Sequence, residues 1–164
     1  MEECPFCLIS VGKIPVKKIY EDNKVIAILD INPANKGHTL VIPRKHYPSL
    51  SLVPPEEIEH IFKVANNIST ALLEISEGTN LLVSNGVSAG QKVEHILIHV
   101  IPRFENDGIN FGWNPRKQTE EELSKLQEEI KKRIPPLEET KPKKGPVDGK
   151  PYERYLIKPE NRRA

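Results

Sequence analysis

The stretch from Glu94 to Arg103 reads EHILIHVIPR and is the longest strand signal in the chain. Successive side chains of a strand point to opposite faces, so His95, Leu97 and His99 are predicted to share one face, opposite an entirely apolar one. The two histidines lie four residues apart, which corresponds to about 13 Å along an extended strand. One metal ion cannot bind both at ligand distances of about 2 Å. They therefore have different roles, unless both are ordinary half-buried histidines.

Short apolar runs rich in β-branched residues predict further strands at 24–31, 39–43 and 80–85. Together with the strand at 94–103 they are sufficient for a sheet that one or two helices can cover. The order of elements predicts an α+β fold built on an antiparallel sheet.

Two helices are predicted from apolar residues spaced three and four apart. The first begins at Pro54-Pro55 and ends before Gly78. The second follows Thr119, which forms a capping-box pattern with Glu122. Each stripe of apolar residues indicates one buried face.

Length and charge limit the classes of protein that fit. The 164 residues include 24 Lys and Arg and 23 Asp and Glu, giving a net charge of +1 and excluding a uniformly basic nucleic-acid binder. Residues 135–164 contain six prolines and eight Lys or Arg, so we expect an extended or disordered tail after a domain at 1–134. No apolar run long enough to cross a membrane and no signal-peptide pattern is found, which favours a cytoplasmic protein without a membrane partner.

Cys4 and Cys7 are the only cysteines, and a Cys-x-x-Cys pair in a cytosolic chain indicates metal binding or redox chemistry. Zinc would require two further nitrogen or sulfur ligands. A pair of free thiols is the alternative.

The loop from Asn85 to Lys92 precedes the histidine strand. Gly86 and Gly90 allow backbone N–H groups to approach an anion, and Asn85 and Gln91 add neutral donors. Such a loop can hold a phosphate, although many unrelated loops share this composition.

Three segments together resemble the histidine-triad (HIT) family. Residues 91–103 resemble its signature, Q-x-V-x-H followed by alternating apolar and histidine positions and Pro-Arg. Residues 29–46 resemble its second diagnostic stretch, and residues 4–15, with Cys-x-x-Cys and Ile-Pro, resemble its N-terminus. The resemblance covers residues 4–134 and implies a HIT-like fold whose homodimer forms one continuous sheet.

The resemblance also assigns roles in binding a purine mononucleotide or dinucleotide. It implies that Asp30 binds the ribose hydroxyls, that His99 contacts the α- or bridging phosphate, and that His38 supports it. It further implies a base pocket formed by Phe6, Ile28, Leu29 and Ile31. The phosphate site that it implies is formed by Asn85, Gln91 and the backbone N–H of Lys92. Some members bind structural zinc, which here implies the ligands Cys4, Cys7, His46 and His95.

Leu97 departs from the family pattern, because the family's middle histidine, the nucleophile, falls on this position. Family members hydrolyse or transfer groups at the α-phosphate through a nucleotidyl-histidine, and leucine has no lone pair for this step. His99 is two residues away, about 6.6 Å along a strand, too far to replace it simply. We therefore expect nucleotide binding with lost or crippled catalysis.

Two other functions remain open. A non-enzymatic nucleotide sensor or scaffold would use the basic tail to bind a protein or RNA partner. A zinc hydrolase is disfavoured, because four protein ligands would close the metal's coordination shell.

Overall fold

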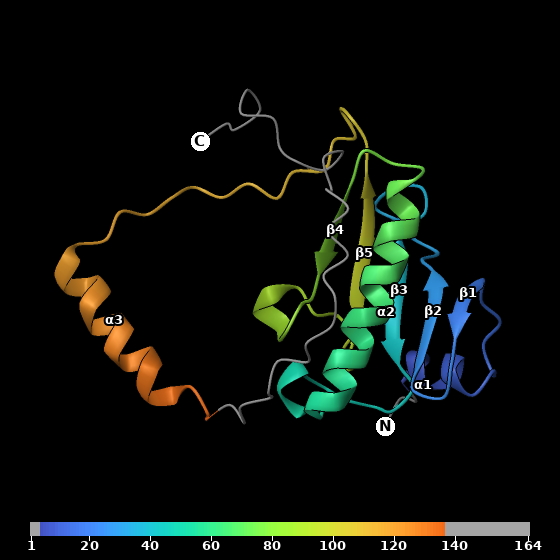
Figure 1. Cartoon of the computed structure of the whole chain (residues 1–164), viewed down its shortest axis with the longest axis horizontal. Helices are drawn as coiled ribbons and strands as arrows, with labels where there is room; N and C mark the ends of the chain where they lie inside the picture. The colour runs from blue at the N-terminus through green and yellow to red at the C-terminus, as the bar shows by residue number, and fades with distance from the viewer. Residues whose placement is uncertain (1–3, 137–164) are drawn as a thin grey trace, which may run out of the picture. The chain divides into compact units, whose positions relative to one another are not determined.

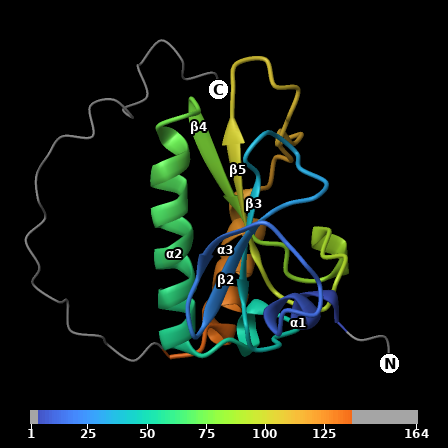
Figure 2. The same cartoon turned by 90° about the vertical axis from the view of Figure 1, so that its right-hand side faces the viewer.

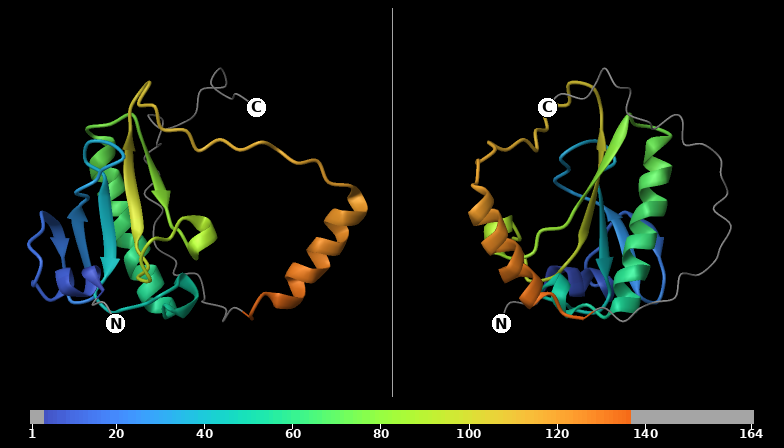
Figure 3. Two further views of the ribbon diagram at one scale, coloured as in Figure 1. Left: turned by 180° about the vertical axis from the view of Figure 1, so that it is seen from behind. Right: turned by 60° about the vertical axis from the view of Figure 1, so that its left-hand side comes forward.

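The computed structural model describes residues 4–136. The chain divides into two units, residues 1–112 and 113–164, which are described separately. The first contains a five-stranded antiparallel sheet with the order β1-β2-β3-β5-β4 (Figures 1 and 3). Its strands are β1 (Lys18–Glu21), β2 (Val25–Leu29), β3 (Thr39–Pro43), β4 (Gly78–Leu82) and β5 (Ile98–Arg103). The predicted α+β class and antiparallel sheet are confirmed.

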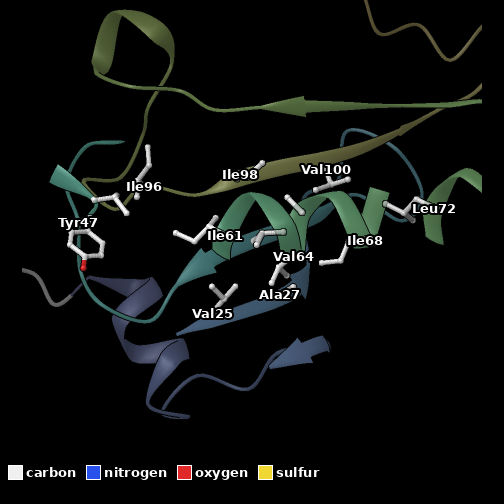
Figure 4. Packing of buried hydrophobic residues seen from close by; sticks show 13 residues of the cluster. Val25, Ala27, Tyr47, Ile61, Val64, Ile68, Leu72, Ile96, Ile98 and Val100 are labelled. Atoms are coloured by element: carbon white, nitrogen blue, oxygen red, sulfur yellow. The ribbon is translucent and has the colours of Figure 1, made fainter. Parts of the chain in front are cut away.

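The helix α2 (Pro55–Leu73) covers one face of the sheet. Its predicted start at a Pro-Pro pair is confirmed, with Pro54 as the N-cap residue. Figure 4 shows its apolar stripe facing alternate residues of β2 and β5. The apolar side chains that meet here include Val25, Ala27, Ile61, Val64, Ile68, Leu72, Ile98 and Val100. The apolar face predicted for the histidine strand therefore lies in the core.

The opposite face of the sheet carries a second apolar cluster and the short helix α1 (Pro5–Ser10) (Figure 2). Ile9 of α1 packs there with the residues of β2 and β3 that point away from α2. Phe6 and Leu97 pack against the same cluster. The sequence did not predict α1, whose six residues are too few for a clear helical period.

The histidine strand is shorter than predicted, because β5 begins at Ile98 and not at Glu94. The backbone N–H of His95 bonds to Val93, and that of Ile96 bonds to Tyr47, at 2.8 and 2.7 Å. These bonds lie outside the ladder with β3 and β4, so residues 94–97 form an irregular approach to the strand. The alternation survives in part, since Leu97 packs on the face away from α2.

Other strand boundaries also move. The strand at 39–43 is confirmed, whereas β2 is shorter than the predicted 24–31. The strand predicted at 80–85 begins two residues earlier and ends three residues earlier, as β4. β2 ends because Asp30 turns the chain: its N–H bonds to the carbonyl of His38, and its Oδ1 accepts from the N–H of Asn32. β1 was not predicted, and all its residues are exposed, so no apolar run marks it.

Residues 113–136 contain α3 (Glu120–Arg133), the second predicted helix. The capping box is confirmed: the Thr119 side chain accepts from the N–H of Glu122, and the Glu122 carboxylate accepts from the N–H of Thr119. The predicted apolar stripe is not buried in this unit, where Leu123, Leu126 and Ile130 are all exposed. The predictions for the tail concern residues that fall mostly outside the described range.

Among residues 4–136, no helix is both long enough and apolar enough to cross a membrane.

Candidate functional site

Two polar clusters form on the sheet. The two histidines of the signature segment, His95 and His99, belong to different clusters. His95 joins Cys4, Cys7 and His46, and His99 joins Asp30 and His38. In each cluster, one ligand atom per residue lies within 4.8 Å of the others. The expectation that the two histidines serve different roles agrees with this arrangement.

In the first cluster, sulfur and imidazole atoms converge. Cys4 Sγ lies 3.3 Å from Nδ1 of His95. Cys7 Sγ lies 3.4 Å from Nδ1 of His46 and 3.7 Å from Nδ1 of His95. The residues come from the N-terminus and α1, from the segment after β3, and from the approach to β5, so only the tertiary fold brings them together.

The orientation of His95 suits metal binding. Its Nε2 lies 2.9 Å from the carbonyl oxygen of Pro43, which can only accept, so Nε2 carries the proton. Nδ1 is then left with its lone pair directed toward the two cysteines. A backbone acceptor on the second ring nitrogen is the usual way in which a metal-binding histidine is fixed. Burial lowers the pKa of His95, which also favours the neutral ring that a metal needs.

Two thiols and two imidazoles at these distances match the donor set of a closed tetrahedral zinc site. His46 is exposed, whereas His95 is buried and the cysteines are half-buried. Phe6 lies between the two cysteines in sequence, and its ring packs edge-on against His95 at 5.7 Å between centroids. The four residues therefore fit a metal that ties the N-terminal segment to the sheet.

In the second cluster, a histidine pair is fixed by the backbone. His38 Nδ1 accepts from the N–H of Ala34 at 3.0 Å, so its proton is on Nε2. That Nε2 lies 3.0 Å from Nδ1 of His99 and donates to it. His99 therefore carries its own proton on Nε2 and presents a hydrogen-bond donor there.

Burial lowers the pKa of both His38 and His99, although the nearby Asp30 carboxylate opposes this. Both rings are then mainly neutral near pH 7, as the chain of hydrogen bonds requires. The same bonds oppose cation binding at this cluster, because the proton on His38 Nε2 occupies the electron pair that a metal would need. Oδ2 of Asp30 lies 3.4 Å from Nδ1 of His38, and no Lys or Arg pairs with this carboxylate among residues 4–136.

Leu97 lies on the same face as this pair. It packs half-buried against the cluster that contains Leu40, and Leu40 is the β3 residue paired with His99. Leu97 thus brings an isobutyl group to this face, with no atom able to attack phosphorus.

The loop after β4 is held by its own polar side chains. Gln91 Oε1 accepts from the N–H of Gly86 at 2.7 Å, and its Nε2 donates to the carbonyls of Pro48 and Val93. Asn85 Oδ1 accepts from the N–H of Leu50 at 3.1 Å. Gly86 has a φ of +93°, which suits glycine. These bonds fix the loop that was predicted to hold phosphate, and they use much of the donor capacity of Gln91.

The residues predicted for the base pocket have different surroundings. Ile28 is buried within the second apolar cluster, and Phe6 packs against it. Leu29 and Ile31 are exposed, the latter at 86%. Two apolar side chains are thus free to contact a ligand, while Ile28 is part of the core.

Two backbone groups that no sequence pattern indicates orient both clusters, the carbonyl of Pro43 and the N–H of Ala34. Every residue carries a carbonyl and nearly every one an N–H, so no residue type could have identified them. Nor does any pattern indicate the hydrogen bond between Asn35 and Asp107, which lie 72 residues apart in sequence.

A five-stranded antiparallel sheet, one covering helix, and histidines supplied by β5 and the segment that precedes it define a histidine-triad domain. The family model named HIT domain matches residues 11–106, more than half of the chain. The chain belongs to the HIT family.

Relatives and solved structures support this assignment. An adenosine 5'-monophosphoramidase of Schizosaccharomyces pombe is 36% identical over 132 residues, covering 80% of this chain and 98% of that protein. A crystal structure of a HIT family member from Bacillus subtilis superposes with a TM-score of 0.77 and 37% identity, covering 83% of this chain and 100% of that one. A zinc-bound histidine triad family protein from Mycobacterium smegmatis gives a TM-score of 0.64 and 36% identity, covering 77% and 97% of the two chains.

Proposed function

We propose that the protein binds a purine mononucleotide or dinucleotide at the face formed by Asp30, His38 and His99. The observation that carries this proposal is the chain of hydrogen bonds from the Ala34 N–H through His38 to Nδ1 of His99, which leaves Nε2 of His99 as a donor for a phosphate oxygen. Neutral donors of this kind bind phosphate without the cost of burying a second charge.

Asp30 supplies the complementary group for the ribose. Its side chain is 16% exposed, and its Oδ1 already accepts one backbone N–H, from Asn32. Each carboxylate oxygen has two lone pairs, so capacity remains for two hydroxyl donors. The exposed Leu29 and Ile31 flank this carboxylate in sequence and offer apolar surface for a base, together with Phe6.

The phosphate end is assigned to the loop of Asn85, Gln91 and the Lys92 backbone. The side-chain bonds of Gln91 and Asn85 hold this loop before a ligand arrives. A loop ordered in advance loses less conformational entropy on binding. Gln91 is therefore proposed to act mainly by shaping the loop.

Leu97 should leave this pocket without the family's covalent chemistry. The proposed class of reaction is hydrolysis or transfer at the α-phosphate of a dinucleoside polyphosphate or nucleoside phosphoramidate, in line with the phosphoramidase relative. Attack requires a nucleophile within about 3–3.5 Å of phosphorus. With leucine at position 97, we infer that binding persists and turnover is lost or crippled.

Zinc is proposed as a structural cofactor of Cys4, Cys7, His46 and His95. When bound, zinc would stabilise the closed arrangement of these four side chains. Support comes from their convergence, from the Pro43 carbonyl that fixes the tautomer of His95, and from the zinc-bound relative of Mycobacterium smegmatis.

A homodimer with a continuous sheet is proposed from the edge strand β4. β4 is the last strand of the sheet and exposes both Leu81 and Leu82. Unpaired edge strands with apolar side chains readily pair with another chain. Analytical ultracentrifugation of Leu82→Glu against the unchanged protein tests this assignment, and an unaltered sedimentation coefficient would contradict it.

The competing function is a nucleotide sensor or scaffold in which residues 135–164 bind a protein or RNA partner. The observation favouring it is the tail's charge, with eight basic and five acidic residues among six prolines. Deleting this segment should then abolish partner capture while nucleotide affinity stays the same.

Titration calorimetry with AMP tests the main proposal. Binding of AMP should be detectable and should weaken in Asp30→Ala and His99→Ala, while His60→Ala, a histidine on α2 outside both clusters, should bind normally. The absence of heat with AMP and with other purine monophosphates would overturn the proposal.

A further inference from the structure

A partly buried ion pair, Arg103–Asp107, lies next to the loop that carries His38. The Asp107 carboxylate is 6% exposed and accepts from Arg103 Nε at 2.7 Å and from Arg103 Nη2 at 2.9 Å. It also accepts from the backbone N–H groups of Phe104 and Ile109. The Arg103 guanidinium holds the pKa of Asp107 well below its usual range, so the carboxylate is charged at all ordinary pH values.

One further donor to this carboxylate comes from far away in sequence. Asn35 Nδ2 donates to Asp107 Oδ2 at 3.1 Å, joining the loop between β2 and β3 to the segment after β5. The side-chain oxygen and the backbone carbonyl of Asn35 also form hydrogen bonds within the loop. Its Oδ1 accepts from the N–H of Lys36, and its carbonyl accepts from the N–H of His38 at 3.0 Å.

The turn between Asn35 and His38 is also tightly packed. Gly37 has a φ of +90°, and a Cβ there would lie 3.3 Å from Leu72 Cδ2 and 3.4 Å from Pro102 Cγ. The loop is thus held at one point by packing and at another by the Asn35–Asp107 bond. These restraints keep the N–H of Ala34 against Nδ1 of His38.

We propose that Asn35 and Asp107 are positioning residues for the histidine pair: they hold the loop so that His38 donates from Nε2 and His99 keeps its proton on Nε2. The relation to nucleotide affinity rests on the function proposed above. The effect on the tautomers does not, because it concerns bonds within the protein alone.

The Arg103–Asp107 ion pair offers a matched control. Arg103 also donates from Nη1 to Oδ1 of Asn80 on β4, at 2.7 Å, and this bond leads away from the histidine loop. Asn80→Ala and Asn35→Ala each remove one side-chain hydrogen bond at the Arg103–Asp107 pair. Only Asn35→Ala releases the loop of His38.

The experiment records the side-chain ¹⁵N shifts of His38 and His99 by NMR, and the affinity for AMP by calorimetry, on the full chain. Asn35→Ala should move both histidines from single tautomers toward averaged shifts and weaken AMP binding by about tenfold. Asn80→Ala should leave the shifts and the affinity unchanged. Asp107→Asn, which removes one accepting oxygen, should act in the same direction as Asn35→Ala.

Two results would overturn the positioning role: unchanged ¹⁵N shifts in Asn35→Ala, or equal changes in Asn35→Ala and Asn80→Ala, which would indicate general loosening. If the unchanged protein binds no AMP while Asn35→Ala still alters the tautomers, the proposed function fails and the positioning role stands. Thermal unfolding of each variant identifies any that do not fold.

Discussion

His95 donates from Nε2 to the carbonyl of Pro43 at 2.9 Å, while its Nδ1 lies 3.3 Å from Cys4 Sγ. One backbone acceptor therefore determines which ring nitrogen is available at the Cys–His cluster. The ring is oriented for metal binding by the fold itself, since Pro43 ends β3 and the His95 segment lies beside it.

Loss of the proposed metal should destabilise the protein and free its N-terminal segment. Cys7→Ser removes a ligand that contacts both histidines. We expect the zinc content to fall from about one ion per chain to near zero, measured by atomic emission. The free energy of unfolding should fall by about 2.7 kcal/mol or more where free zinc exceeds its dissociation constant a hundredfold.

His60→Ala is the control for the zinc measurement alone, because His60 lies on α2 outside the cluster but bonds to Asp22. It should retain the metal. Equal zinc content in Cys7→Ser and the unchanged protein would contradict the ligand assignment.

Leu97→His should restore turnover of an adenosine phosphoramidate. The new imidazole would occupy the face that already carries His99, and removal of a nucleophile from an enzyme costs several orders of magnitude in rate. We expect an increase of at least about a thousandfold in kcat, measured by release of AMP. The control is Leu97→Gln, which adds a polar group but no comparable nucleophile and should stay inactive. Equal turnover in the unchanged protein and in Leu97→His would refute the role given to Leu97.

Asp22 should make folding sensitive to acid. Burial alone would raise its pKa, but hydrogen bonds from Tyr20, the N–H groups of Lys24 and Val25, and His60 outweigh burial and hold the pKa well below its usual range. The carboxylate links β1, the following turn and α2, with Tyr20 Oη and His60 Nε2 both at 2.6 Å.

Because the folded pKa of Asp22 is depressed, its contribution to stability is present above the unfolded pKa of about 4 and is lost as the pH falls below that value. Asp22→Asn should cost about 1–2 kcal/mol near neutral pH and flatten the loss of stability on acidification. Urea unfolding at a series of pH values measures both effects. The control is Glu94→Gln, at an exposed carboxyl, which should change neither the stability at neutral pH nor its loss in acid. An unaltered acid profile in Asp22→Asn would contradict the role given to Asp22.

Thr119→Ala should weaken α3 specifically. It removes the side-chain acceptor for the N–H of Glu122, at a cost of about 1 kcal/mol in helix stability. Backbone chemical shifts of residues 120–133 should move toward random-coil values. Ser124→Ala within the same helix removes no cap and should leave these shifts helical; full helicity in Thr119→Ala would show that the cap is dispensable.

Local pattern predicted the elements best where a long stripe or a cap defines them. The 19-residue α2 and the capping box of α3 follow from spacing within a few residues. Strand ends were less predictable, because a strand ends where its backbone hydrogen bonds to the neighbouring strand stop, and the local sequence does not show this. Residues 94–97 have the alternation of a strand, yet their N–H groups bond to Val93 and Tyr47 instead.

The sequence by itself determined the alternation that buries one side of the histidine segment, the thiol and imidazole groups of its motifs, and the leucine at position 97. These features depend on residue identity and short periods. The tertiary structure decided which histidine joins which cluster and on which nitrogen each proton lies. The tautomer of His95 depends on Pro43, which is distant in sequence, and that of His38 depends on the nearby N–H of Ala34, in a loop that Asn35 ties to the distant Asp107. Such contacts are governed by how the loops pack together in space.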